Sequence, residues 1–142
     1  MEITGSMLIG AVSTKGMGGE FKAFSPGLNV EIDPVFGCGG ADDVDRACKL
    51  AATASTPYRA TTPLQRAHFL ETIARRIEEL GALLIERAAL ETALPTVRLE
   101  GERGRTTGQL RHFARVVRMG HWLGATLDSP LPERTPLPRP DL

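Results

Sequence analysis

Residues 91–122 read ETALPTVRLEGERGRTTGQLRHFARVVRMGHW, and this stretch decides the fold that we predict for the chain. Pro95 marks a boundary near its start. Beyond that boundary, apolar side chains recur at the spacing of one helix face, at Leu110, Phe113, Ala114 and Val117. Gly120 follows as a natural C-terminal stop. The stretch therefore predicts a helix over residues 97–119.

Three more helices are predicted upstream. The first begins near Asp42, because acidic residues fill its first turn, where the helix dipole favours negative charge. It should stop before Pro57, since a proline disfavours the α conformation of the residue before it. The second begins at Thr62, which can cap the helix while Gln65 completes a capping box. Gly81 either separates this helix from a third or lies inside one long helix at a cost of about 1 kcal/mol.

Short strands are predicted on both sides of these helices. Near-alternating apolar residues between positions 7 and 32 indicate two or three strands, and the glycines of residues 15–19 would supply the reversal of a hairpin. Residues 25–27 read SPG and signal another turn. Alternating Leu123, Ala125 and Leu127 indicate a C-terminal strand. The prolines from Pro130 to Pro140 then indicate an extended segment, because proline at this density fits neither a helix nor a central strand.

Composition limits the classes of function. The chain has 142 residues, of which 42% are hydrophobic, so one domain with a sizeable core is possible. A formal net charge of zero argues against a dedicated nucleic-acid binder. Cys38 and Cys48 form no CxxC pair, which argues against a zinc site or a disulfide framework and fits a reduced, cytoplasmic setting. No segment looks like a signal peptide or is apolar over a membrane-spanning length, so no membrane partner is expected.

Residues 37–40, GCGG, precede a helix and could form a phosphate cradle. Three aspartates follow almost at once, at Asp42, Asp43 and Asp45, and would repel a phosphate. The spacing also matches neither GxGxxG nor GxxxxGK[ST]. We therefore interpret these residues as a structural turn.

Arg111, Arg115 and Arg118 lie on one face of the predicted helix, with spacings of i, i+4 and i+7. They could contact an anion or nucleic acid, but no aromatic residues are interleaved with them, so pairing with acids on a solvated or interface face is favoured. Acids gather in residues 31–46 and arginines in residues 98–118, which suggests pairing within the chain or between subunits. The substitutions Asp43→Arg and Arg115→Asp, singly and together, would test that hypothesis.

The other reactive side chains lack a catalytic pattern. His68, His112 and His121 have no metal-ligand spacing, so surface or supporting roles are predicted. Glu78 and Glu79, like Glu100 and Glu102, diverge on a helix and cannot converge on one substrate atom.

The two cysteines are interpreted differently. Cys48 falls on the apolar face of its helix, which predicts inert packing. Cys38 lies near a helix N-terminus, which could lower its pKa, but it has no evident general base and stands beside three acids. We assign no catalytic, cofactor-binding or metal-binding residue in this chain.

Several motifs carry a resemblance to a known family. Residues 99–114, LEGERGRTTGQLRHFA, and residues 116–122, VVRMGHW, are the most specific, and DVDRA at residues 43–47 with Glu91-Thr92 adds to them. The chain resembles the N-terminal part of the aldehyde dehydrogenase superfamily, and it is most similar to the branch that oxidises 2-oxoglutarate semialdehyde. The common ETGKP motif of the family is ETALP here, with Ala93 in place of glycine.

The resemblance implies an α+β segment of a larger α/β enzyme. Residues 1–122 would form a β-hairpin and about four helices of the cofactor-binding domain, and residues 123–142 would lead toward an oligomerisation strand. In this family the cofactor loop, the oxyanion-hole asparagine, the glutamate base and the cysteine nucleophile all follow the region matched here. NAD or NADP would serve the parent enzyme, and we expect the segment alone to bind neither.

We therefore expect an N-terminal segment of an NAD(P)-dependent aldehyde dehydrogenase that is inactive by itself. Its partner would be the remainder of that chain or another copy, and the parent would be a homo-oligomer. A stand-alone helical interaction module is the alternative, and a small anion-binding protein using the three arginines is a third. If the first interpretation holds, the stripe of Leu110, Phe113 and Val117 should be only partly buried, because its covering sheet is elsewhere.

Overall fold

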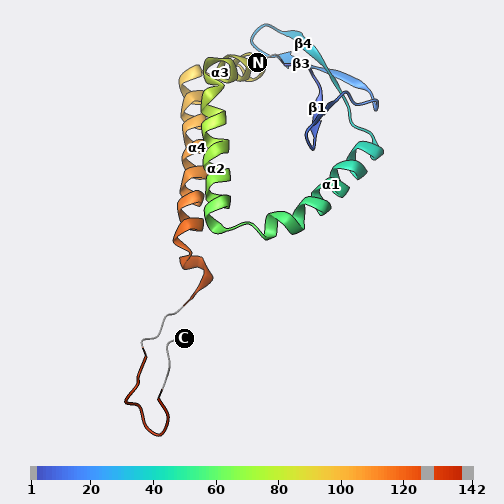
Figure 1. The fold of residues 1–142 in the computed structure, drawn as a ribbon. Helices are drawn as coiled ribbons and strands as arrows, with labels where there is room; N and C mark the ends of the chain where they lie inside the picture. Colours follow the sequence, from blue (N-terminus) through green and yellow to red (C-terminus); the bar gives the residue numbers. More distant parts are fainter. Residues whose placement is uncertain (1–2, 126–129, 139–142) are drawn as a thin grey trace.

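The computed structural model describes residues 3–125 and 130–138. Its elements in chain order are β1 (Met7–Ile9), β2 (Val12–Thr14), β3 (Glu20–Ser25), β4 (Val30–Gly37), α1 (Ala41–Arg59), α2 (Pro63–Glu79), α3 (Gly81–Thr92), α4 (Thr96–Met119) and the 3-10 turn η1 (His121–Leu123). Figure 1 shows two small hairpins on one side and an upright pair of helices, α2 and α4, on the other. Helix α1 spans the distance between the hairpins and this helix pair. The predicted α+β class with four helices is confirmed.

The strands form two separate antiparallel hairpins. β1 pairs with β2 around Gly10, which has a φ of 64°. β3 pairs with β4 from the Glu20–Gly37 partners to the Ser25–Val30 partners. The turn predicted at residues 25–27 is confirmed, and it closes with a 2.8 Å hydrogen bond from the Asn29 N–H to the Ser25 carbonyl.

The hairpin reversal predicted at residues 15–19 is wrong, because these residues connect the two hairpins instead of turning one. Their glycines serve close backbone packing. A Cβ atom placed on Gly16 would lie 2.0 Å from the Cys38 carbonyl oxygen, a distance that no side chain tolerates. Nearby, the Gly18 N–H donates to that same oxygen at 2.9 Å.

Helix α1 differs from the prediction at its end. The helix continues through Pro57 to Arg59 instead of stopping before the proline. Pro57 lies in the last turn, so it costs one intrahelical bond, and the Ala60 N–H still donates to the Thr56 carbonyl at 3.2 Å. The carboxylate of Asp43 accepts from the Gly40 N–H at 3.1 Å and closes the N-terminal end.

Helix α2 begins at its predicted cap, and of the two alternatives for Gly81 the structure has a separate helix α3. The Gln65 N–H donates to the Thr62 hydroxyl at 3.2 Å, and the Thr62 N–H donates to the Gln65 side chain at 2.8 Å, which completes the capping box. Gly81 begins a new helix and has a φ of 57°, so the helical conformation is interrupted between α2 and α3. Helix α3 ends at Ala93, which adopts the left-handed conformation with a φ of 56°.

Helix α4 also ends as predicted, at a left-handed Gly120 with a φ of 68°. The strand predicted from Leu123 is wrong at its start, because left-handed Gly120 and Gly124 enclose the 3-10 turn η1. Leu127 lies outside the described residues. Described residues 130–138 contain turns and bends without a helix, which agrees with the proline-rich sequence.

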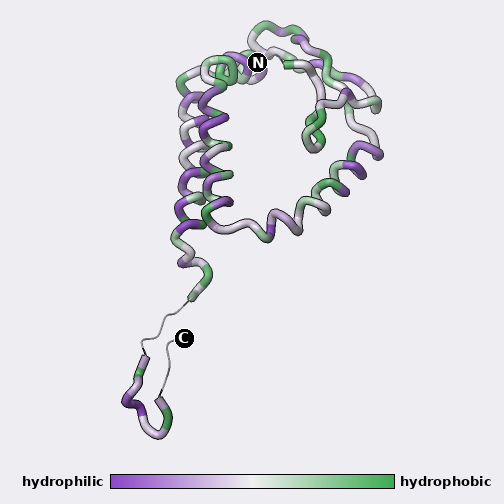
Figure 2. Tube along the Cα trace, in the orientation of Figure 1, coloured by the Kyte–Doolittle hydropathy of each residue, from purple (hydrophilic) through white to green (hydrophobic). Residues whose placement is uncertain are grey.

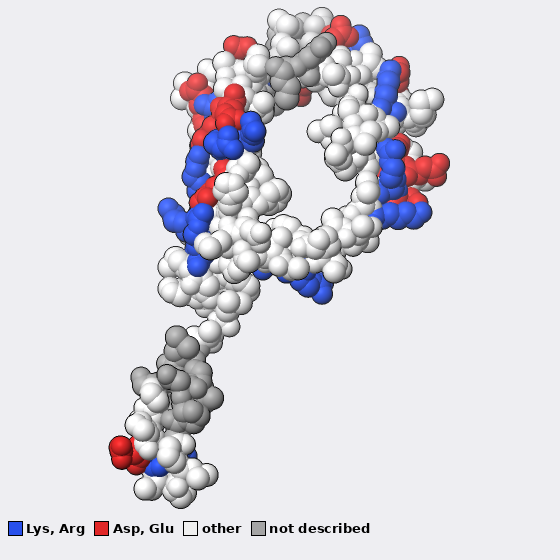
Figure 3. Space-filling model, viewed as in Figure 1, with Lys and Arg blue, Asp and Glu red and all other residues white. Residues whose placement is uncertain are grey.

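The core is small and lies mainly between α2 and α4. Its buried hydrophobic residues are Ala67, Ala74, Ile85 and Ala114. Alanines at the contact let the two helix backbones approach closely. Figure 2 shows other hydrophobic positions spread along the hairpins, α1 and the helix pair, without one shared interior. Figure 3 shows an opening through the molecule, which these elements surround.

The predicted partial exposure of the α4 stripe is confirmed. Phe113 is 48% exposed, and Leu110 and Val117 are half-buried.

Candidate functional site

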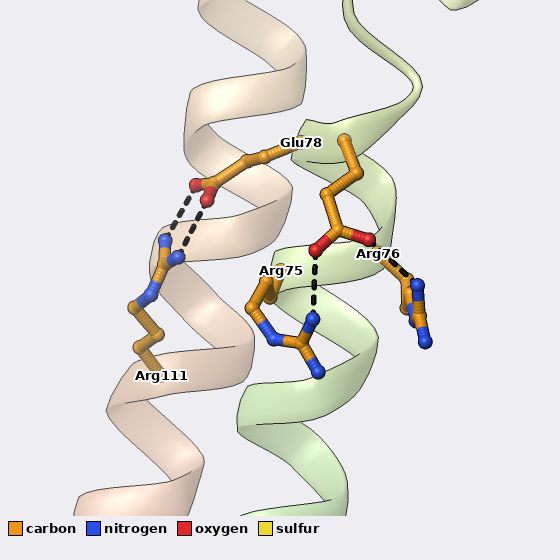
Figure 4. Close-up of polar contacts among 5 residues, drawn as sticks. Arg75, Arg76, Glu78 and Arg111 are labelled. Atoms are coloured by element: carbon orange, nitrogen blue, oxygen red, sulfur yellow. Dashed lines mark hydrogen bonds and ion pairs between the residues drawn. The ribbon is translucent and has the colours of Figure 1, made fainter.

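The most elaborate polar arrangement joins α2 to α4. Arg111 makes a bidentate pair with Glu78, with both nitrogen–oxygen distances at 2.6 Å (Figure 4). Two helical turns away, Arg118 holds Glu71 in the same way at 2.5 and 2.7 Å. Both acids are seven residues apart on α2, and both arginines are seven residues apart on α4. The pairs therefore form a two-rung ladder between antiparallel helices, which we call the Glu–Arg ladder.

The ladder shifts the pKa values of its acids. Hydrogen bonding from Arg111 lowers the pKa of Glu78 to about 2, and Arg118 lowers the pKa of Glu71 in the same manner. In turn, the hydrogen bonds that Arg111 donates to the Glu78 carboxylate raise the pKa of Arg111. Near neutral pH all four groups stay charged, so none can serve as a general acid or base. The ladder therefore fixes the register of two helices and offers no proton chemistry.

The ladder borders an open groove of about 670 Å³ that also includes His68, Thr72, Arg75 and Arg115. Arg75 is engaged with Glu79 at 2.7 Å, and Arg76 holds the other oxygen of the same acid at 2.9 Å (Figure 4). The predicted pairing of the arginine face with acids is thus confirmed for Arg111 and Arg118. Their partners, Glu71 and Glu78, were missed, although the matching seven-residue spacings were visible in the sequence.

The structure, which describes both segments in full, shows no ion pair between the acids of residues 31–46 and the arginines of residues 98–118. The acids pair locally, Asp33 with Lys22 at 2.8 Å and Asp45 with Lys49 at 2.6 Å. Asp43 likewise pairs with Arg46 at 3.3 Å, and among the described residues Arg115 makes no ion pair. The within-chain form of the Asp43–Arg115 hypothesis is therefore wrong, since Asp43 pairs with a nearer base.

The cysteines and histidines lie apart from one another. Cys38 is half-buried, whereas Cys48 is exposed, so the predicted packing of Cys48 is wrong. Cys48 lies on α1, and none of the residues of this helix is buried. All three histidines, His68, His112 and His121, are exposed. Within residues 3–125 and 130–138, no three His, Cys, Asp or Glu side chains gather as metal ligands would.

The glycine-rich residues 37–40 have a structural explanation. Gly37 lies against the backbone of Gly16, where a Cβ atom would be 2.7 Å from the Gly16 nitrogen. The N–H of Gly40 is taken by Asp43 at 3.1 Å, which places a carboxylate where a phosphate would bind. These contacts support the interpretation of a structural turn.

An apolar groove of about 330 Å³ runs along α3. It is lined by Leu80, Leu83, Leu84, Leu90 and Ile3, with Glu86 and Arg87 beside them. Arg87 donates to the Asp33 carbonyl and to Glu91, both at 2.5 Å, and so ties α3 to β4. Leu83 is 55% exposed, which leaves the groove uncovered by the described chain. None of the described helices combines the length and apolarity that crossing a bilayer requires.

The similarity of this chain to known proteins extends over most of its length. The model of the aldehyde dehydrogenase family matches residues 14–136. The chain is 56% identical over 143 aligned residues to alpha-ketoglutaric semialdehyde dehydrogenase 2 of Azospirillum brasilense, an alignment that covers 100% of this chain and 27% of the relative. It is 56% identical over 101 residues to the alpha-ketoglutaric semialdehyde dehydrogenase of Acinetobacter baylyi, covering 71% of this chain and 19% of that relative.

The chain thus spans about a quarter of the length of the first of these curated relatives. The family match reaches from β2 to the proline-rich residues and takes in the whole helical part described above. On this evidence, the chain belongs to the aldehyde dehydrogenase family.

Proposed function

We propose that this chain forms the N-terminal segment of an NAD(P)-dependent dehydrogenase that oxidises 2-oxoglutarate semialdehyde to 2-oxoglutarate. The observation that carries the proposal is the 56% identity to a relative with that substrate in its name, over the whole of this chain. The segment would act as scaffold, and the groups that react would come from the rest of the polypeptide.

The chemistry of the described residues supports a scaffold role. Oxidation of an aldehyde through a covalent intermediate needs an activated nucleophile and an oxyanion site. Exposed Cys48 and half-buried Cys38 have no hydrogen-bonded base among the described contacts. The Glu–Arg ladder instead provides two charge-assisted joints that hold α2 and α4 in register. NAD or NADP would accept the hydride, bound by residues outside this segment.

The organisation that we propose follows the same logic. Residues 1–122 would be the hairpin and helical part of the cofactor-binding domain, and residues 123–142 would lead toward an oligomerisation strand. The parent enzyme would be a cytoplasmic homo-oligomer. The uncovered apolar groove on α3 and the half-exposed stripe on α4 support this arrangement, because faces of this kind mark a missing partner.

A chimera tests the proposal. The chain replaces the aligned 143-residue segment of the Azospirillum brasilense relative, and NAD(P)H formation is followed with 2-oxoglutarate semialdehyde. We expect activity from the chimera and none from the isolated chain. The relative without its aligned segment is the control, and it should be inactive. Turnover of any aldehyde by the isolated, contaminant-free chain would contradict the proposal.

The alternative is a stand-alone helical interaction module. The same exposed groove on α3 would suit it, so exposure alone does not separate the two functions. A chimera that folds but shows no activity, beside an active intact relative, would favour the module.

A further inference from the structure

We propose that α1 is a conditional strap, a segment that becomes a stable helix only when the remainder of the dehydrogenase polypeptide covers its inner face. The inference rests on the proposed function for the identity of the covering chain. Figure 1 shows where α1 lies, between the hairpins at one end and the α2–α4 pair at the other.

Helix α1 has little tertiary support beyond a few edge contacts, such as the 3.2 Å hydrogen bond that Arg46 donates to the Thr14 hydroxyl. None of its 19 residues is buried, and only Asp43 and Ala47 are even half-buried. By contrast, α2 buries Ala67 and Ala74, and α4 buries Thr107 and Ala114. Most helical stability in proteins comes from tertiary packing of an apolar face, and α1 gains little from that source because none of its residues is buried.

The sequence of α1 adds no compensating local stability. Pro57 removes one backbone donor inside the helix. Thr53 donates its hydroxyl back to the Lys49 carbonyl at 2.9 Å, an arrangement that slightly destabilises and bends helices. The exposed pair of Asp45 and Lys49, 2.6 Å apart, supplies only a small gain of the kind found at helix surfaces.

One face of α1 is nevertheless built for contact. Ala47, Leu50, Ala51, Ala54 and Tyr58 recur at helical spacing along it. Two residues of this face, Leu50 and Tyr58, anchor it within the chain. Leu50 approaches the β1–β2 turn at Gly10, and the Tyr58 ring meets Phe69 of α2 edge-on at 6.2 Å. Between the anchors the face stays uncovered, and Tyr58 is still 50% exposed.

The covering chain that we propose is the remainder of the dehydrogenase polypeptide. The segment equivalent to this chain is 27% of the Azospirillum brasilense relative, so most of that polypeptide lies outside it and is available to fill the opening. Figure 3 shows that opening bordered by α1 and the α2–α4 pair. A small, alanine-rich face suits close packing against backbone of the same molecule.

Amide hydrogen exchange, read peptide by peptide, tests the strap. In the isolated chain we expect amides of α1 to exchange at least about tenfold faster than those of α2 and α4, because local stability follows packing. In the chimera described above, protection of α1 should rise to that of the helix pair. Ala54→Lys, on the inner face, should abolish this gain. Ala52→Lys, a matched change on the outer face, should preserve it.

The results of hydrogen exchange and of the activity assay separate the strap from the proposed function. Protection of α1 equal to that of α2 and α4 in the isolated chain would overturn the strap. An active chimera in which α1 still exchanges fast would also overturn it while leaving the proposed function standing. A folded, inactive chimera with a protected α1 would support the strap and contradict the proposed function. If the chimera does not fold, the intact relative and its excised segment give the same comparison.

Discussion

At the scale of single residues, hydrogen bonds between residues a few positions apart in the sequence could be predicted. The Thr62–Gln65 capping box is an example, since all its donors and acceptors lie within four residues. The exposure of Cys48 could not be predicted, because helical spacing marks an apolar face without showing whether anything covers it. Pro57 was misjudged because a proline in the last turn breaks only one hydrogen bond.

Ala93 carries a residue-scale prediction. It adopts a φ of 56° at the end of α3, a conformation that costs an L-residue roughly 1–2 kcal/mol and that glycine adopts freely. We expect Ala93→Gly to raise the free energy of unfolding by about 1 kcal/mol, measured by urea denaturation. Ala89→Gly, inside the same helix, should lower it by about 1 kcal/mol. A loss of stability at position 93 would show that the left-handed end is not populated.

At the scale of elements, helices were predictable from local signals such as the capping box at Thr62 and the terminal glycine at Gly120. The division into two hairpins was not, since the glycines of residues 15–19 look the same whether they turn a strand or pack against a backbone. The Glu–Arg ladder needed knowledge that α2 and α4 lie antiparallel. Seven-residue spacings on two helices are common, and only their apposition makes them partners.

The ladder predicts how stability depends on pH. The pKa of Glu78 is lowered from 4.5 to about 2 in the folded chain, so its pairing stabilises the fold above pH 4.5 and is lost as the pH falls toward 2. Glu78→Gln should therefore lower the urea midpoint at neutral pH, and its difference from the unmodified chain should shrink as the pH falls through this window. The measurement is the urea midpoint as a function of pH.

Glu79→Gln provides the matched control. Among the described residues, Glu79 pairs only with Arg75 and Arg76 of its own helix, so its loss leaves the α2–α4 joint intact. The neutral-pH effect should be smaller than that of Glu78→Gln. Equal effects from both substitutions would mean that the inter-helix pair contributes nothing beyond ordinary surface charge.

At the scale of the whole molecule, the chain surrounds an opening instead of enclosing a core. The spacing of apolar residues predicted which helix faces are apolar. Phe113 is half-exposed, which agrees with the prediction that the apolar stripe of α4 is only partly buried. The arrangement of those faces around the opening could not be predicted, because helical periodicity marks an apolar face without showing what lies against it. A neutral net charge gives the exposed faces little electrostatic protection from one another.

Exposed apolar surface should be measurable in solution. We expect the isolated chain to enhance the fluorescence of an apolar dye such as anilinonaphthalene sulfonate, and Leu83→Asp in the α3 groove to reduce that signal. Val97→Asp is the control, because Val97 is 77% exposed but does not line the groove. Dye binding that neither substitution changes would place the apolar surface elsewhere.

The kcat/KM for 2-oxoglutarate semialdehyde in the chimera with the Azospirillum brasilense relative tests the scaffold assignment most directly. If this chain supplies structure and the remainder supplies chemistry, the chimera should come within about tenfold of the intact relative, since all the reacting groups would be those of the relative and the exchanged segment is 56% identical to the one it replaces. A chimera that folds and assembles like the relative, yet has no activity above background, would contradict the account.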